Sequence, residues 1–468
     1  MKKEEYLKIL TDQIRCRMAR KEVEDEIRGH IEDQTRDFLS EGMERDEAEA
    51  AAVREMGNPV EVGNQMDRIH RPVMPWGMIA LIVLLSIAGC ALEYFLGQKI
   101  ADVSEGGYTV GGFRYGERML YTAVGLLVMT GVCFADYTRI ALRARELMAA
   151  LFAVILWGLF FHGVSVNGST RHIYLGMGVV TVNVLLLLFL TVPLYAAILY
   201  RYRGEGWKAA LKAVLWMIPG TAVAIFCNST GMMFVLLITY LAVFGMAVYR
   251  GWYRVSRKTL LSVTVAAAVL LPVVMAVLYW FLGTDYQKER LMSFLQYEPQ
   301  YVSYISVYVR ELLANSRLIG QGAGVPDIGS MPELSEVMLS AVAGYYGILV
   351  ALALLGFILF LLLRFLRTSL RQRNQLGMLM GFGCAFIFLA EALIYLLNNC
   401  GFICMENYCP FLTRSGTGTV MTYILFGLLL SICRYQNTAP ERKTAEMKRF
   451  LSRRFLKEEK RKNPSADI

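Results

Sequence analysis

Hydrophobic and polar positions divide the chain into three parts. Between about residues 74 and 433 the apolar residues come in long runs, each sufficient for a helix that crosses about 30 Å of hydrocarbon. The flanking residues 1–73 and 434–468 are polar. The pattern predicts an all-α fold, a polytopic bundle of about ten transmembrane helices preceded by a small soluble helical domain. The expected spans are 74–97, 118–136, 147–166, 174–199, 210–227, 230–249, 260–282, 337–363, 377–398 and 416–433.

The polar head, residues 1–73, shows apolar residues at helical spacing. We expect helices over 2–19, 23–40 and 44–56, with Gly57-Asn58-Pro59 ending the third and starting a fourth. The segments 29–33, 42–49 and 56–59 resemble the permease prefix domain that precedes various bacterial membrane proteins. The resemblance implies a regulatory or protein-interaction role for residues 1–73.

Basic residues mark one side of the predicted bundle. They follow every even-numbered span, whereas the loops after odd spans lack such clusters. By the positive-inside rule the even loops, the head, the tail and both termini face the cytoplasm. The longest outward loop, about 284–336, is then the expected place for extracytoplasmic chemistry. The basic residues are Arg139, Arg143, Arg145, Arg201, Arg203, Lys208, Lys212, Arg250, Arg254, Arg257, Lys258, Arg364, Arg367, Arg371 and Arg373.

Composition and charge narrow the classes of function. With 56% hydrophobic and 19% charged residues, the chain is neither a soluble enzyme nor a disordered protein. The head carries 13 Lys/Arg and 18 Asp/Glu. The tail from residue 434 carries 11 Lys/Arg and 5 Asp/Glu. The basic tail would be attracted to anionic membrane lipids, or it is simply a solvated helix. We expect no nucleic-acid partner, because no aromatic platform accompanies the basic cluster.

Several motifs occur in a fixed order along the bundle. From about Asp285 these are Arg290–Leu295, Ser316–Gly322, Met331–Glu336 and Pro410–Gly418, and the earlier segments Gly168–Gly176 and Asn228–Gly231 precede them. Together they resemble the SEDS family of bacterial membrane glycosyltransferases, of the RodA, FtsW and SpoVE type. The resemblance implies a cell-membrane protein for which ten spans and cytoplasmic termini are the expected topology.

The chain departs from the family pattern at polar positions. The functional Asp of the family is Glu336 here, and one residue is missing between it and Glu333. Gln321 replaces a Lys, and Arg414 replaces a Tyr. Thr181–Val184 replaces a Gln-Pro-Ser-Glu stretch. These changes favour a second hypothesis, that the chain is a non-catalytic scaffold or regulator of cell-wall synthesis, and a third is a flippase for lipid-linked precursors.

The resemblance implies polymerisation of glycan strands from lipid II at the outer face of the membrane. A base must accept the proton of the acceptor sugar hydroxyl, and Glu336 is the candidate. The alternative is that Glu336 only caps the eighth span. A class B penicillin-binding-type transpeptidase is the implied partner. A divalent cation stays open as a cofactor.

The candidate substrate-binding residues flank this carboxylate in the sequence. The arginines could neutralise a pyrophosphate, or they could snorkel to the interface. The hydroxyls and glycines could cradle a sugar or an anion at the start of the tenth span, or simply cap it. The candidates are Arg290, Arg317, Glu333, Thr413, Arg414, Ser415, Gly416 and Thr417.

Three further features carry smaller expectations. Glu391 lies inside the ninth span and needs a partner, for which Asn183, Asn228 or Arg171 are candidates.

Cys400, Cys404 and Cys409 share one outward loop, where two could form a disulfide or all could stay reduced. No metal site is expected, and His30 with Glu32 and Asp33 is interpreted as a solvated helix face.

Overall fold

The computed structural model describes residues 1–15, 17–103, 115–166, 169–174, 176, 181–282, 288, 304–323 and 336–436. Its contacts divide the chain into two compact units. One is built on residues 1–75, and the other on residues 76–371 and 376–431.

The first unit contains four helices, α1 (Lys3–Asp12), α2 (Arg17–Ser40), α3 (Arg45–Glu55) and α4 (Pro59–His70). Their apolar faces share one core. The side chain of Asn58 accepts a 3.0 Å hydrogen bond from the Val60 amide and so caps α4, whose first residue is the expected proline. The buried core residues are Tyr6, Leu7, Leu10, Ile14, Ala19, Val23, Ile27, Ile31, Ala52 and Val53.

The first predicted helix of the head is wrong in its extent. α1 ends at Asp12, and α2 begins at Arg17 instead of Val23. The Arg15 amide donates to Asp67 Oδ1 at 2.8 Å, so a side chain of α4 satisfies a donor that a continuous helix would have used internally. The break lets α1 and α2 pack against the same core, which a single straight helix over 2–19 could not do.

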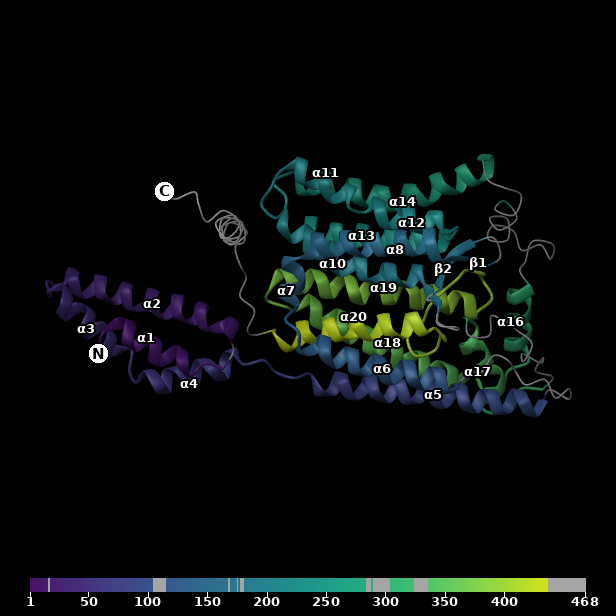
Figure 1. Ribbon diagram of the computed structural model, residues 1–468, viewed down its shortest axis with the longest axis horizontal. Helices are drawn as coiled ribbons and strands as arrows, with labels where there is room; N and C mark the ends of the chain where they lie inside the picture. The colour runs from purple at the N-terminus through teal and green to yellow at the C-terminus, as the bar shows by residue number, and fades with distance from the viewer. Residues whose placement is uncertain are drawn as a thin grey trace. The chain divides into compact units, whose positions relative to one another are not determined.

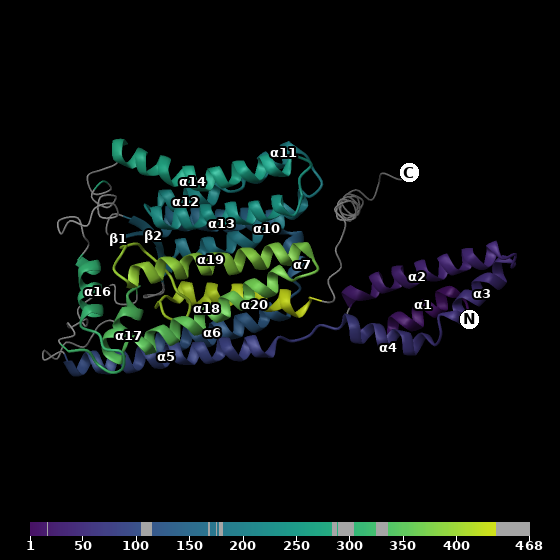
Figure 2. The same cartoon turned by 180° about the vertical axis from the view of Figure 1, so that it is seen from behind.

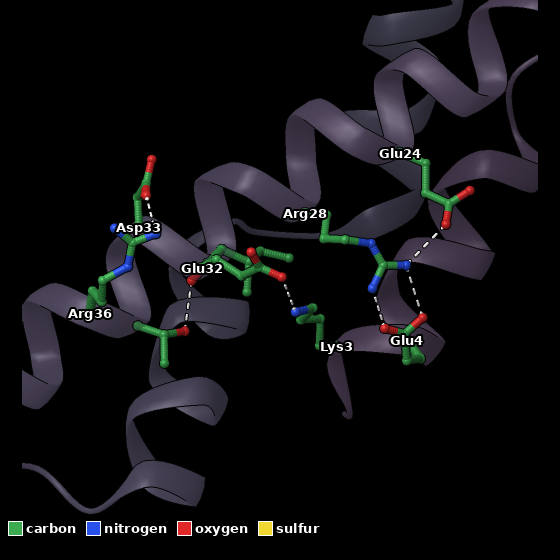
Figure 3. A network of polar contacts seen from close by, with 9 residues as sticks. Lys3, Glu4, Glu24, Arg28, Glu32, Asp33 and Arg36 are labelled. Carbon is green, nitrogen blue, oxygen red and sulfur yellow. Dashed lines mark hydrogen bonds and ion pairs between the residues drawn. The ribbon is translucent and has the colours of Figure 1, made fainter. Parts of the chain in front are cut away.

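Ion pairs connect α1 and α2 on the surface of this unit (Figure 3). Lys3 Nζ lies 2.7 Å from Glu32 Oε1, and Arg28 contacts both Glu4 and Glu24. Hydrogen bonding to Arg28 lowers the pKa of Glu4, and Lys3 does the same for Glu32. These carboxylates are solvent-exposed, so the pairs specify how the two helices align more than they stabilise the unit.

The second unit is a helical bundle. Within the described residues, ten helical stretches are long and apolar enough to cross a membrane. Six lie within three residues of the expected spans at both ends, and the other four shift further at one end or both. The spans are α5 (Trp76–Val103), α6 (Tyr115–Phe134), α8 (Ala144–His162), α9 with η1 and α10 (Val184–Leu187, Leu188–Leu190, Thr191–Arg201), α11 with α12 (Trp207–Leu215, Ile218–Phe226), α13 (Thr230–Tyr249), α14 (Arg257–Leu282), α18 (Ile348–Leu370), α19 (Gln375–Asn399) and α20 (Gly416–Arg434).

Burial separates central from peripheral spans. The window 184–201 is 83% buried, whereas the window 257–274 on α14 is only 6% buried. α14 accordingly lies at the edge of the bundle, and α10 and α19 lie inside it (Figure 1). A helix that is apolar all round and exposed on most of its surface fits a lipid environment.

The start of the predicted fourth span is wrong. Residues 163–183 instead contain a small antiparallel sheet of β1 (Gly163–Val166), β2 (Ser169–Tyr174) and β3 (Thr181–Asn183), in the order β1-β2-β3. Polar residues alternate with β-branched ones here, so the strands satisfy their backbone groups by pairing. The span begins only at Val184, where Asn183 Oδ1 accepts a 3.0 Å hydrogen bond from the Leu185 amide.

The predicted eighth span is wrong as one continuous helix over 337–363. A short helix, α17 (Met338–Tyr346), is separated from α18 by Gly347, whose φ is +106°. A side chain at 347 would approach Ile319 Cα and Leu318 O to 2.7 Å. Only glycine tolerates this φ and this close approach, so the apolar run divides here.

The two ends of the bundle differ in what they carry. β1, β2, α16 (Tyr304–Ala314) and α17 gather at one end (Figure 1). The short helix α7 (Tyr137–Leu142) lies at the opposite end, as the reverse view also shows (Figure 2). The end with α16 and α17 is the one that the loop charges predict to face outward.

Candidate functional site

Glu336 is half-buried and directly precedes α17. Its main-chain oxygen accepts a 3.0 Å hydrogen bond from Asn399 Nδ2 at the end of α19. Asn399 Oδ1 in turn accepts from the amide and the hydroxyl of Ser340, at 3.0 and 2.9 Å. Glu336 thus lies at the N-terminal end of α17, one short helix before the span α18.

An apolar cluster that includes Val337 and Met338 packs next to Glu336. α16 and α17 pack with the outward end of α5, and Arg310 Nε donates a 3.0 Å hydrogen bond to the Gly401 oxygen. The Glu336 backbone is therefore fixed by a buried amide on one side and by packed helices on the other. The cluster consists of Leu96, Ile305, Val309, Leu312, Val337, Met338, Ala341 and Tyr345.

The segment 317–322 packs along the junction of α17 and α18. The amides of Gly320 and Ile348 donate to Tyr346 O and Arg317 O at 3.0 and 2.9 Å. Arg317 is exposed, so its guanidinium is accessible at the same end of the bundle as Glu336. Arg290 and Glu333 lie outside the described residues.

The predicted loop 413–417 forms the N-terminal cap of α20. Ser415 Oγ accepts a 3.1 Å hydrogen bond from the Gly418 amide, and Thr413 Oγ1 accepts from the Cys409 amide at 2.9 Å. Gly416 has no space for a side chain, because a Cβ there would meet the Tyr121 ring at 2.7 Å. Ser415 therefore caps α20, one of the two roles foreseen for it, whereas Thr413 accepts from the loop that precedes the helix.

Arg414 lies beside two carboxylates rather than in an open groove. Its guanidinium is 3.8 Å from Glu93 on α5 and 3.8 Å from Glu117 on α6. Glu93, which is 1% exposed, also pairs at 2.6 Å with Arg118, which donates to the carbonyls of Phe411 and Leu412. The charge of Arg414 is thus already compensated.

The Glu93–Arg118 pair is the main feature that sequence reasoning missed. Glu93 lies within a predicted span, and an acidic residue in an apolar run is a signal by itself. A small polar cavity of about 20 Å³ adjoins the pair, enough for about one water molecule. Its lining includes Ser86, Arg118, Thr122, Tyr408, Thr413, Thr419, Thr422 and Tyr423.

A second polar cluster connects the sheet with the loop between α19 and α20. Arg171 on β2 pairs with Glu406 at 2.7 Å, and Asn183 Nδ2 donates to the same carboxylate at 3.4 Å. The main-chain amide of Asn183 donates to Thr417 Oγ1 at 3.0 Å. The segments 168–176, 181–184 and 410–418 thereby meet at one place.

Glu391 has a main-chain partner that the sequence did not predict. Glu391 is 1% exposed, and its Oε2 accepts a 3.0 Å hydrogen bond from the Tyr408 amide. Asn183 and Arg171 are instead bound to Glu406. A backbone donor was not foreseen because it depends on how the loop folds back over α19.

No disulfide joins Cys400, Cys404 or Cys409, all of which are described. Cys409 is buried, and burial raises the pKa of the Cys400 thiol, which disfavours its reactive thiolate. Among the described residues, no group of three or more His, Cys, Asp or Glu side chains could hold a metal ion.

The end of the bundle that carries α16 and α17 holds Glu336 on a backbone anchored by Asn399. Arg317 is exposed near the other end of α17, where its main-chain oxygen accepts from the Ile348 amide. The polar clusters around Glu93 and Glu406 hold the loop between α19 and α20 in place. A half-buried carboxylate can accept a proton, and an exposed guanidinium can bind an anion.

Comparison with known proteins agrees with this architecture. The family described as cell cycle proteins of the FtsW, RodA and SpoVE type matches residues 76–438. A relative from Alcanivorax borkumensis, described as a probable peptidoglycan glycosyltransferase FtsW, is 27% identical over 367 residues, covering 74% of this chain and 90% of its own length.

Solved structures show the same fold. A chain from a peptidoglycan synthase complex that coordinates polymerization and crosslinking matches with a TM-score of 0.59 and 20% identity, over 77% of this chain and 98% of its own. The rod shape determining protein RodA of Thermus thermophilus matches with a TM-score of 0.53 and 18% identity, over 78% and 98%. This chain therefore belongs to the FtsW, RodA and SpoVE family of cell cycle proteins and is a multi-pass bacterial membrane protein.

Proposed function

We propose that the protein is a peptidoglycan glycosyltransferase that polymerises glycan strands from lipid II at the outer face of the cell membrane. Family membership and the relative described as a glycosyltransferase support the reaction class. The observation that carries the proposal is the position of Glu336, a half-buried carboxylate on a backbone anchored by Asn399.

Glu336 acts as the general base in this proposal. It accepts the proton of the acceptor sugar hydroxyl, whose oxygen then attacks the anomeric carbon of the donor as the bond to pyrophosphate breaks. A carboxylate at a membrane–water boundary is partly desolvated, which makes it a better proton acceptor. The extra methylene of Glu relative to Asp is matched by the residue missing before it.

Arg317 is the described arginine best placed to meet the departing pyrophosphate. It is exposed, whereas Arg414 already lies beside Glu93 and Glu117. A guanidinium suits phosphate oxygens because it donates in a planar fork. Arg290 and Glu333 remain proposed substrate contacts from the sequence resemblance, as do Gly416 and Thr417 at the start of α20.

A transpeptidase is the proposed partner, since the matching synthase complex couples polymerization with crosslinking. The four-helix head, residues 1–73, is proposed as a cytoplasmic regulatory domain, and the basic tail from 434 as a segment drawn to anionic lipids.

The test is polymer formation from lipid II by the purified full-length protein in liposomes. Glu336→Gln should lower the rate by at least about 100-fold, because the amide cannot accept the proton. Glu311→Gln is the matched control, since Glu311 is an exposed carboxylate on α16. Full activity of Glu336→Gln would remove the base assignment.

The non-catalytic hypothesis rests on the compensated charge of Arg414. A wild-type protein inert towards lipid II with several class B transpeptidases would favour a scaffold. Transfer of lipid II across the bilayer without polymer would favour a flippase.

A further inference from the structure

Two arginines lie close together at the end of the bundle that carries α7. Arg145 is in the first turn of α8, and Arg201 is the last residue of α10. Each therefore stands at the boundary of a membrane-spanning segment. The loops at this end carry the basic residues that predict the cytoplasmic side.

Aromatic side chains pack together beside these arginines. Trp216 Nε1 donates a 3.1 Å hydrogen bond to the Tyr202 hydroxyl, and Tyr200 packs edge-on against Trp252 at 5.5 Å. Tyr200, Tyr202 and Trp252 are buried, so they form a fixed support for the arginines inside the protein. The depth of the guanidinium groups follows from their place at the ends of two membrane-spanning segments, where lipid headgroups are expected.

Among the described residues, neither guanidinium group forms an ion pair with a carboxylate. Arg201 Nη2 donates to the oxygen of Leu142, at the C-terminal end of α7. Arg145 Cζ lies 5.1 Å from the centre of the Tyr202 ring. Main-chain carbonyls and an aromatic face orient these groups but cancel little of their charge.

Like charges lie close together in this pair. Arg145 and Arg201 repel each other, and Glu146, which attracts Arg201, is exposed and forms no ion pair with it in the described structure. Both Nε atoms are buried without a hydrogen-bond partner among the described residues. Partial burial of the two groups strengthens their attraction for an anion at their outer edges.

We propose that Arg145 and Arg201 bind the phosphate of an anionic phospholipid in the leaflet at this end of the bundle. Two half-buried guanidinium groups offer paired donors that match phosphate oxygens, and the anion would relieve their mutual repulsion. A lipid is favoured over phosphate in solution because the site lies at the ends of two membrane-spanning segments. The site is independent of Glu336 and of the proposed polymerisation.

For the test, the purified full-length protein is mixed with detergent micelles that contain either phosphatidylglycerol or phosphatidylcholine. Native mass spectrometry then measures how much of each lipid stays bound to the protein. Arg145→Gln is the key variant, because Arg145 makes no hydrogen bond within the described chain and its loss should leave the fold intact. Arg139→Gln is the control, since Arg139 is 83% exposed in the same region and pairs with Asp136.

Wild type and Arg139→Gln should retain phosphatidylglycerol in preference to phosphatidylcholine, and Arg145→Gln should bind it about fivefold more weakly. Arg201→Lys, which keeps the charge but loses the fork, should weaken binding less than Arg145→Gln. Equal losses in Arg145→Gln and Arg139→Gln, or equal retention of both lipids by wild type, would refute a site. Displacement of the lipid by millimolar inorganic phosphate would overturn the assignment to a lipid.

Discussion

The side-chain amide of Asn399 donates to the main-chain oxygen of Glu336 at 3.0 Å, and Asn399 itself is 2% exposed. Its Nδ2 also donates to Tyr395 O at 2.9 Å, while its Oδ1 accepts two bonds from Ser340. A buried amide with all of these bonds made fixes the geometry around it. The end of α19 thus determines where the proposed catalytic carboxylate stands.

We predict that Asn399→Asp impairs the proposed polymerisation while Glu336 itself is intact. The variant keeps the acceptor for Ser340 but loses the donor to Glu336 O and places a carboxylate oxygen against that carbonyl. A displacement of about 1 Å costs roughly 100-fold in rate. The measurement is the polymerisation rate, together with hydrogen exchange over residues 338–346.

Asn398→Asp provides the control for this prediction. Asn398 is equally buried, and its Nδ2 donates to Met405 O at 3.2 Å, away from α17. It should leave hydrogen exchange in α17 unchanged. If both variants loosened α17 equally, the specific link between Asn399 and Glu336 would be wrong.

The buried Glu93–Arg118 pair gives a prediction about stability. Glu93→Gln leaves Arg118 with an uncompensated charge in a nearly dry site, which costs about 3–5 kcal/mol. The double variant Glu93→Gln/Arg118→Met removes that charge and should recover part of the loss. Thermal unfolding of the detergent-solubilised protein measures both, and a double variant less stable than Glu93→Gln would contradict the argument.

His172 makes the sheet sensitive to pH. Burial, followed by the charge of Arg171, lowers the pKa of His172 below its ordinary value of 6.5, and Glu406 opposes this only in part. The folded sheet therefore favours the neutral imidazole. As the pH falls below 6.5 the unfolded segment takes up a proton more readily than the folded one, so acid destabilises the sheet.

We predict that hydrogen exchange over residues 169–174, corrected for its intrinsic pH dependence, increases between pH 7.5 and 5.5. His172→Gln should abolish this increase, because the amide does not titrate. His162→Gln, at an exposed position at the end of α8, should behave like wild type. An increase that persists in His172→Gln would assign the pH sensitivity to another group.

Apolar periodicity predicted the ten spans well where a run has no internal interruption. Thr230–Tyr249 was expected at 230–249, and α20 differs by one residue. Apolar periodicity failed where an apolar run contains a helix break that depends on a tertiary contact. Gly347 divides α17 from α18 because Leu318 and Ile319 lie against it, and no local pattern reveals that contact.

The candidate site was predicted less completely, because partners in a folded bundle lie far apart in sequence. Arg414 was foreseen as a free cation, but Glu93 lies beside it from a helix 321 positions earlier. Glu406 was not among the predicted site residues, although its carboxylate accepts hydrogen bonds from both Arg171 and Asn183. Thr417 lies at the start of the tenth span as predicted, but its contact with Asn183 requires β3, where the sequence analysis expected a helix.

Gly347 offers the sharpest test of the divided segment. Gly347→Ala places a Cβ 2.7 Å from Ile319 Cα and Leu318 O, on a backbone with φ +106°. The strain of such a conformation costs about 1–3 kcal/mol, so segment 317–322 should detach from the α17–α18 junction. We expect trypsin to cleave after Arg317 faster than in wild type, since this exposed residue then lies on a loosened chain.

Gly356→Ala is the matched control for this change. Gly356 lies inside α18, and nothing lies within 4 Å of the position that a Cβ would take. Alanine is the better helix former, so this variant should be at least as stable as wild type and leave cleavage after Arg317 unchanged. Because α17 connects this junction with Glu336 at its other end, Gly347→Ala should also lower the proposed polymerisation rate, whereas Gly356→Ala should not. Equal cleavage after Arg317 in the two variants would mean that the close contact at Gly347 does not hold the loop.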